Sequence, residues 1–232
     1  MRPLLTWIAA GLMLALPSHA GDRPVVVELY TSQGCSSCPP ADAFLHELAE
    51  RDDVLALAMH VDYWDYIGWK DSFARPEHTA RQRAYAKADG RRMIYTPQMI
   101  IDGQDHVIGN RPKDVLDVIK AHRARPDTVA LEVRREGEEI VISADRLDGA
   151  ADPLRVQLVR YAPRDTVDIL RGENAGRTLS YANIVTDMRV LGTWGGSAPL
   201  NIRETVTGDA PVVVVLQSDD GAGRVEAAME LR

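Results

Sequence analysis

The sequence predicts an α/β domain followed by an all-β, sandwich-like domain. Between residues 21 and 126, short β-rich apolar runs alternate with helical patterns in the order β-α-β-α-β-β-α. After residue 126 the helical patterns stop, and short strands separated by turn residues follow one another. A chain of 232 residues, 45% of them hydrophobic, can bury cores of ordinary size. We therefore expect one domain over residues 21–126 and a second over residues 127–232.

Each element of the α/β domain has a local signal. Strands are expected where β-branched and apolar residues run together, and helices where apolar residues recur on one side. Pro39 suits a first helical turn because its missing N–H would be unpaired there anyway, and Asp102-Gly103 is a favourable hairpin turn. In chain order we expect strand Val25–Tyr30, helix Pro39–Glu50, strand Val54–Val61, helix Pro76–Ala88, the paired strands Gln98–Ile101 and His106–Ile108, and helix Pro112–Arg123.

The second domain shows only strand patterns. Turn pairs such as Glu136-Gly137 and Asp148-Gly149 separate them, and several short strands with regular turns are typical of a β-sandwich. The expected strands are Val129–Val133, Glu139–Ala144, Leu154–Tyr161, Thr166–Leu170, Thr178–Val190, Pro211–Gln217 and Arg224–Leu231.

The first twenty residues have the layout of a secretory signal peptide. Arg2 precedes the apolar run Leu4–Leu16, and Ser18-His19-Ala20 has the small-x-small pattern of a signal peptidase site. The apolar run is too short to be a spanning helix, and no later stretch is apolar for long enough. We expect a signal peptide over residues 1–20, export to the periplasm or secretion, and no membrane span.

Charge and cysteine content narrow the function. A formal net charge of −7 argues against nucleic acid and anionic membranes as partners. Both cysteines of the chain, Cys35 and Cys38, lie in one CxxC. A disulfide across so short a loop constrains the unfolded chain little, so stabilisation is a poor reason for the pair. No cofactor is expected.

The position of the CxxC predicts redox chemistry. Cys35-Ser36-Ser37-Cys38 follows a strand and precedes a helix, and a helix N-terminus favours an anion such as a thiolate. Cys35 is therefore the expected nucleophile, and Cys38, in the first turn and less accessible, the expected resolving cysteine. The natural partners are protein thiols or disulfides of other exported proteins.

A proline before the third strand supports this interpretation. Thr96-Pro97 stands at the place in the element order where thioredoxin-like domains carry a proline whose cis peptide bond faces the CxxC. This resemblance implies that the Thr96-Pro97 bond is cis and that Thr96 offers backbone groups to an extended partner. The alternative is an ordinary trans proline at a strand start. The aromatic segment after the second strand contributes Trp64 and Tyr66 to the expected substrate-binding surface.

Together, the element order, the CxxC and Pro97 resemble the thioredoxin superfamily. The runs Glu28–Pro40, His60–Trp69 and Arg171–Asn174 resemble a narrower group, the bacterial secreted family called domain of unknown function 1223. That resemblance implies a thioredoxin-like fold and export, and no established activity. The chain departs from typical thioredoxins in having Gly34 before the first cysteine, where they have an aromatic residue, and Ser36-Ser37 between the cysteines, where they usually have Gly-Pro.

Two alternative functions use the same cysteines. The pair is an inert local disulfide if the protein is a redox-silent binding protein on a thioredoxin scaffold. Alternatively, Cys35 and Cys38 hold copper(I) for delivery, with His60 as a third ligand, although His60 is more often a structural residue. No other metal site is expected, because two thiolates alone do not complete a zinc site.

Two further segments carry open interpretations. Asp62, Asp65 and Asp71 either line a substrate groove or belong to a covering loop packed against the second helix, and one of them could accept the proton of Cys38. The segment Arg171–Arg177 is either a hairpin turn or a contact to the first domain. The best overall hypothesis is an exported thiol-disulfide oxidoreductase whose β-rich domain selects or docks partners.

Overall fold

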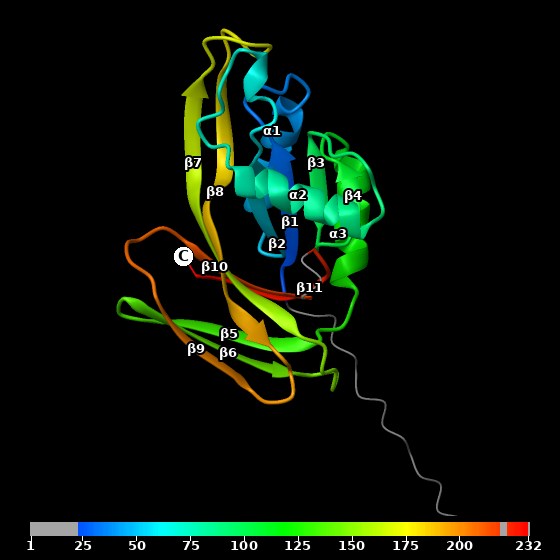
Figure 1. Cartoon of the computed structure of the whole chain (residues 1–232), viewed down its shortest axis with the longest axis vertical. Helices are drawn as coiled ribbons and strands as arrows, with labels where there is room; N and C mark the ends of the chain where they lie inside the picture. Colours follow the sequence, from blue (N-terminus) through cyan, green and yellow to red (C-terminus); the bar gives the residue numbers. More distant parts are fainter. Residues whose placement is uncertain (1–22, 219–221, 232) are drawn as a thin grey trace, which may run out of the picture.

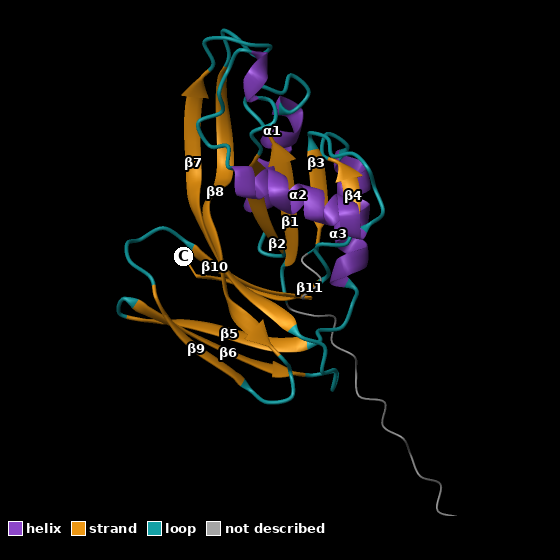
Figure 2. Ribbon diagram, in the orientation of Figure 1, coloured by secondary structure: helices purple, strands orange, loops and turns teal. Residues whose placement is uncertain are grey.

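The computed structural model describes residues 23–218 and 222–231 (Figure 1). Residues 1–20, which the sequence predicts to be a signal peptide, lie outside the described residues. The chain is a mixed α/β structure with a large β-sheet and few helices (Figure 2). In the part that is described, no helix is both long and apolar enough to cross a bilayer.

The first half of the chain has the element order that the sequence predicts. Its elements are β1 (Val25–Thr31), α1 (Pro39–Ala49), β2 (Val54–His60), the short 3₁₀ helix η1 (Asp65–Ile67), α2 (Pro76–Ala88), β3 (Gln98–Ile101), β4 (Asp105–Ile108) and α3 (Pro112–Arg123). β1 pairs in parallel with β2 and antiparallel with β3, and β3 pairs antiparallel with β4. Every residue of β1 and β2 is buried, which explains why most of them are apolar.

The hairpin between β3 and β4 has the predicted turn at Asp102-Gly103. The φ angles are 47° at Asp102 and 69° at Gly103, the left-handed values that a two-residue hairpin turn needs. A Cβ atom on Gly103 would lie 2.2 Å from the Gly223 carbonyl oxygen. Glycine is therefore required here both by backbone conformation and by the close approach of a distant segment.

The second half of the chain consists of strands. They are β5 (Val129–Glu136), β6 (Glu139–Arg146), β7 (Leu154–Asp168), β8 (Thr178–Trp194), β9 (Leu200–Thr205), β10 (Val212–Ser218) and β11 (Val225–Leu231). β5, β6 and β9 form a three-stranded sheet, and the other four join the strands of the first half. The resulting eight-stranded sheet has the order β11-β10-β7-β8-β2-β1-β3-β4.

The large sheet therefore crosses the predicted boundary near residue 126. β8 lies next to β2, with Ala58 opposite Ile184 in a parallel pairing, and the Asn183 side chain donates to the Ala56 carbonyl (2.9 Å). The β-rich half extends the sheet of the α/β half. The division of the chain into two domains, residues 21–126 and 127–232, stays a prediction.

The long hairpin of β7 and β8 differs from the sequence-based expectation. The sequence predicts two strands, Leu154–Tyr161 and Thr166–Leu170, but the first and the start of the second, up to Asp168, belong to the single strand β7. Pro163 is tolerated inside β7. β10 pairs with β7 only from Leu154 to Arg160, so beyond Arg160 the edge of β7 that faced β10 has no partner strand that would need the missing proline N–H. The hairpin is thus long enough to reach from the β-rich half to the CxxC end of the molecule (Figure 1).

An apolar core lies between the two sheets. Val133 and Ile142 of the small sheet pack in one cluster with Leu158 and Val214 of the large sheet. β9, which the sequence analysis did not predict, completes this small sheet beside β6. Its half-buried and exposed residues alternate, but only Leu200 and Ile202 on the half-buried side are apolar, so the strand pattern in the sequence is short.

Helix α2 turns a polar side toward the sheet. Glu28 on β1 is 2% exposed and accepts two hydrogen bonds from the Arg81 guanidinium, at 2.7 and 2.8 Å. Arg81 also donates to Gln157 of β7 (3.2 Å) and Gln217 of β10 (3.0 Å). Burial raises the pKa of Glu28, but Arg81 outweighs burial and the pKa lies below its usual value. This ion pair links both halves of the chain through polar contacts.

Candidate functional site

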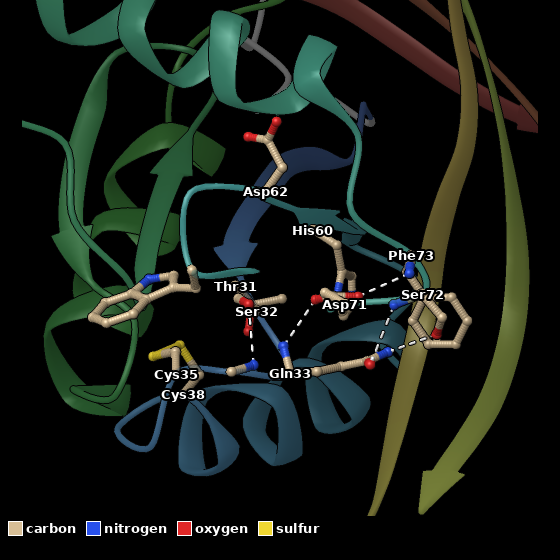
Figure 3. Close-up of polar contacts among 12 residues, drawn as sticks. Thr31, Ser32, Gln33, Cys35, Cys38, His60, Asp62, Asp71, Ser72 and Phe73 are labelled. Atoms are coloured by element: carbon tan, nitrogen blue, oxygen red, sulfur yellow. Dashed lines mark hydrogen bonds and ion pairs between the residues drawn. A yellow bond between two sulfur atoms is a disulfide. The ribbon is translucent and has the colours of Figure 1, made fainter. Parts of the chain in front are cut away.

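The two cysteines lie between β1 and α1 and are joined in a disulfide. The Cα atoms of Cys35 and Cys38 are 5.4 Å apart, and Figure 3 shows the bridge between their sulfur atoms. The Cys38 N–H donates to the Cys35 carbonyl (3.2 Å), and the Cys38 carbonyl accepts the N–H of Ala41 (2.8 Å). Cys38 is therefore the residue that caps the start of α1, and Cys35 lies in the turn before it.

Both cysteines are buried. The exposed fraction is 1% for Cys35 and 0% for Cys38, whereas Ser36 and Ser37 between them are exposed. The expected difference in accessibility between the two cysteines is not present in the disulfide form. Segments from three parts of the chain surround the motif.

Pro97 lies beside the first turn of α1. Its peptide bond with Thr96 is cis, as the sequence analysis expects. The Gly109 N–H donates to the Pro97 carbonyl (2.9 Å), and a Cβ on Gly109 would lie 3.1 Å from Pro97 Cβ and 3.3 Å from Ala41 Cβ. Since Ala41 follows Cys38 by less than one helical turn, Pro97 is close to the CxxC end of the helix.

The aromatic segment brings Trp64 to Thr96. The Trp64 indole N–H donates to the Thr96 hydroxyl (2.7 Å), so two of the expected substrate-binding residues contact each other. Tyr66, which is also one of the expected substrate-binding residues, is 81% exposed. The same segment packs on α2, where the Tyr63 hydroxyl donates to Gln82 (3.2 Å). It therefore covers α2 and at the same time presents an aromatic side chain beside the motif.

Gly34 fits against this aromatic segment. A Cβ on Gly34 would lie 3.2 Å from Ile67 Cδ1 and 3.4 Å from Trp64 Cβ. These contacts are tight even for a methyl group, so a larger side chain before Cys35 would displace the segment. The aromatic segment occupies the place that an aromatic residue before the first cysteine would need.

Asp71 ties the aromatic segment to the backbone before the CxxC (Figure 3). Its Oδ2 accepts the Gln33 N–H (2.8 Å) and a hydrogen bond from His60 Nδ1 (2.7 Å), and its Oδ1 accepts the Phe73 N–H (2.8 Å). Burial raises the pKa of Asp71, but His60 and these donors outweigh burial and the pKa lies below its usual value. Asp71 is therefore an ionised structural anchor and a poor proton acceptor near neutral pH.

The copper(I) interpretation, with Cys35, Cys38 and His60 as ligands, stays a prediction. Among the residues that the structure describes, no three His, Cys, Asp or Glu side chains converge on a common metal position. His60 is 0% exposed, and its Nδ1 is engaged by Asp71. It lies opposite Thr31 in the register of β1 and β2, and the Asp71 segment holds it there rather than at the sulfur atoms.

Asp42 is a site residue that the sequence analysis missed. It lies in the first turns of α1, where its N–H donates to the Cys38 carbonyl (3.0 Å). It is 5% exposed, and its Oδ1 accepts the Thr31 hydroxyl (2.7 Å). Within the described residues its Oδ2 has no hydrogen-bond partner. Burial raises the pKa of Asp42 to about 7, in spite of the opposing effects of His60 and the Thr31 hydrogen bond.

The tip of the β7–β8 hairpin is the third segment at the motif. The sequence allows the segment Arg171–Arg177 to be a hairpin turn or a contact to the first domain. In the structure it joins β7 to β8 and also contacts the CxxC turn. Asn174 is 1% exposed, and its side-chain amide donates to the Gln33 carbonyl (2.9 Å) and the Cys35 carbonyl (3.0 Å). A Cβ on Gly172 would lie 3.2 Å from Trp69 Cβ. The tip thus packs against the aromatic segment and the CxxC turn together (Figure 1).

The sequence model of a family described as "Protein of unknown function (DUF1223)" matches residues 26–217, a range that contains β1, the CxxC, the aromatic segment and the β7–β8 hairpin. The chain belongs to the DUF1223 family. No curated protein matches the sequence.

Two solved structures are similar to this member of the DUF1223 family. A crystal structure of a protein from Agrobacterium tumefaciens, a structural-genomics target, is 33% identical, with a TM-score of 0.77 over 89% of this chain and 93% of that one. HBP35 of Porphyromonas gingivalis is 14% identical, with a TM-score of 0.61 over 90% of this chain and 75% of that one. The second likeness concerns the fold alone.

Proposed function

We propose that this DUF1223 protein is an exported, thioredoxin-like thiol-disulfide oxidoreductase acting on the thiols or disulfides of other exported proteins. The observation that carries the proposal is the disulfide of Cys35 and Cys38 at the start of α1, with the cis peptide bond of Pro97 close to the same turn. A cysteine pair between a strand and a helix is suited to reversible exchange because the helix N-terminus favours a thiolate. The layout of residues 1–20 supports export.

The exchange proceeds through one mixed disulfide. When the pair acts as an oxidant, a substrate thiolate attacks the Cys35 sulfur, the bond to Cys38 breaks, and Cys38 leaves as a thiolate. A second substrate thiolate then attacks the substrate sulfur of the mixed disulfide and releases Cys35 as a thiolate. Two electrons pass from the substrate to the protein pair, and the substrate gains one disulfide. The reverse sequence reduces a substrate disulfide.

Asp42 exchanges a proton with the Cys38 sulfur. With a pKa of about 7, its carboxyl is divided between the two protonation states near neutral pH, and its Oδ2 is unpaired among the described residues. It follows Cys38 on α1 by one helical turn, so the two side chains share a helix face. Asp42 donates a proton to the departing Cys38 thiolate and takes one from the Cys38 thiol in the reverse direction.

Thr96, Pro97, Trp64 and Tyr66 provide the surface for the partner. Trp64 orients the Thr96 hydroxyl, and the exposed Tyr66 ring of the same aromatic segment offers apolar contact to a partner. The β-rich half contributes the hairpin tip that borders this surface, which supports a role for it in docking partners.

A redox-silent binding protein is the second candidate function. The specific observation in its favour is the burial of both cysteines, 1% and 0% exposed. A disulfide that no thiol can reach would serve only to hold the turn between β1 and α1.

Glutathione disulfide distinguishes these two functions when it is added to reduced single-cysteine variants. Cys38→Ala should form a stable mixed disulfide between Cys35 and glutathione, because the resolving thiol is missing, whereas Cys35→Ala should react at least about tenfold more slowly. The adduct is measured by intact-protein mass spectrometry. Equal rates for both variants, or no adduct in either, would contradict the assignment of Cys35 as nucleophile.

A further inference from the structure

Asn174 contacts the CxxC turn from the far end of the sequence. It lies in the tip of the β7–β8 hairpin, 139 residues from Cys35. In the segment Arg171–Arg177 it is the one buried residue, and the residues on both sides of it are exposed. A hairpin turn that only reversed the chain would not bury a polar side chain against another segment.

The hydrogen bonds of Asn174 use its whole amide group. Its Nδ2 donates to the carbonyl of Gln33 (2.9 Å) and to the carbonyl of Cys35 (3.0 Å). Its Oδ1 accepts from the Arg177 guanidinium (3.1 Å), which orients the nitrogen toward the two carbonyls. Both carbonyls belong to the turn that carries the nucleophilic sulfur, and they flank Gly34.

Gly34 lies between these two carbonyls and, having no side chain, restrains the backbone there less than any other residue would. In the oxidised protein the disulfide itself limits the movement of Cys35 relative to Cys38. In the reduced protein that bond is gone, and the two hydrogen bonds from Asn174 hold the backbone on both sides of Gly34. They keep the two thiols in position for ring closure, which favours the intramolecular disulfide over the dithiol.

We propose that Asn174 is a positioning residue for the Cys35–Cys38 pair, which shifts the equilibrium between dithiol and disulfide toward the disulfide by holding the Gln33 and Cys35 carbonyls. The inference rests on the proposed exchange function and adds to it that the β-rich half sets the redox equilibrium of the site. Asn174 acts through the backbone carbonyls of the turn and not through the sulfur atoms.

The equilibrium constant of the pair against dithiothreitol tests this. Asn174→Ala should shift the equilibrium about tenfold toward the dithiol, which is about 30 mV for a two-electron couple. Arg177→Ala, at an exposed position, should shift it about threefold in the same direction, because it removes only the contact that orients the amide. Glu173→Ala, an exposed neighbour in the same loop, is the matched control and should match the wild type within about twofold.

Each outcome decides the role of Asn174. If Asn174→Ala melts cooperatively and its equilibrium constant lies within twofold of the wild type, Asn174 does not position the pair. If Asn174→Ala fails to fold, Arg177→Ala decides, and an unchanged constant there overturns the proposal. Failure of the exchange function itself has a different signature. In that case the reduced Cys38→Ala variant forms no glutathione adduct, while the ratio of the dithiothreitol constants still measures the effect of Asn174.

Discussion

Arg81→Ala is expected to lower the free energy of unfolding by about 3 to 5 kcal/mol, the usual effect of removing one partner of a buried ion pair. Glu28 is 2% exposed, and without the guanidinium its charge would stay buried beside the hydroxyls of Tyr30 and Tyr85. Arg81 also contacts Gln157 and Gln217, so the loss affects both halves of the chain. Urea denaturation at pH 7 measures the change.

A double-mutant cycle separates the buried charge from lost packing. Glu28→Gln in the Arg81→Ala background removes the unpaired charge, so the double variant should be more stable than Arg81→Ala alone. Arg83→Ala, exposed on the same helix, is the control and should change stability by less than about 0.5 kcal/mol. A double variant no more stable than the single one would contradict the charge-pair explanation.

Asp42→Asn is expected to stabilise the protein above pH 7. The folded pKa of about 7 lies above the ordinary value of 3.8, so between about pH 4 and pH 7 the folded state holds a proton that the unfolded state has lost. The free energy of unfolding of the wild type therefore falls as the pH rises through that window. Asparagine removes this penalty, which amounts to at most about 4 kcal/mol at pH 8. Urea denaturation at pH 4, 6 and 8 should show no gain at pH 4 and the full gain at pH 8.

The same substitution should slow exchange. Without a proton donor for the Cys38 thiolate, reduction of the disulfide by dithiothreitol at pH 7 should be roughly a hundredfold slower, as is typical for loss of a general acid. Asp52→Asn, exposed just after α1, is the control and should change neither the rate nor the pH dependence of stability. A variant that is less stable at pH 8 and reduced at the wild-type rate would contradict the role of Asp42.

Local signals predicted several elements in the first half of the chain. Pro39 marks the start of α1 and Asp102-Gly103 marks the hairpin turn. Both depend on backbone preferences within a few residues, which are visible in a single sequence. The cis bond of Pro97 was instead implied by the resemblance to thioredoxin-like domains. The extent of β7 was not predictable in this way, because Pro163 normally ends a strand and is tolerated here only where β10 no longer pairs.

The site residues that the sequence analysis missed depend on long-range contacts. Asp42 has the sequence signature of an ordinary acidic residue in a first helical turn, where it is favourable in solvent. Only the Thr31 hydroxyl, the His60 ring and the surrounding packing make it a buried carboxyl. Nothing local in the sequence shows that the Asn174 amide reaches the Cys35 carbonyl. In the same way, the contact of the His60 ring with Asp71 is visible only in the structure.

A redox titration of the wild-type protein against glutathione measures whether Cys35 and Cys38 exchange reversibly. The dithiol and disulfide fractions are fixed with an alkylating mass tag and counted by mass spectrometry. We predict reversible exchange with a reduction potential between about −120 and −270 mV, the range of known exchange proteins. A pair that stays oxidised to below about −300 mV would behave as a structural disulfide and would contradict this prediction.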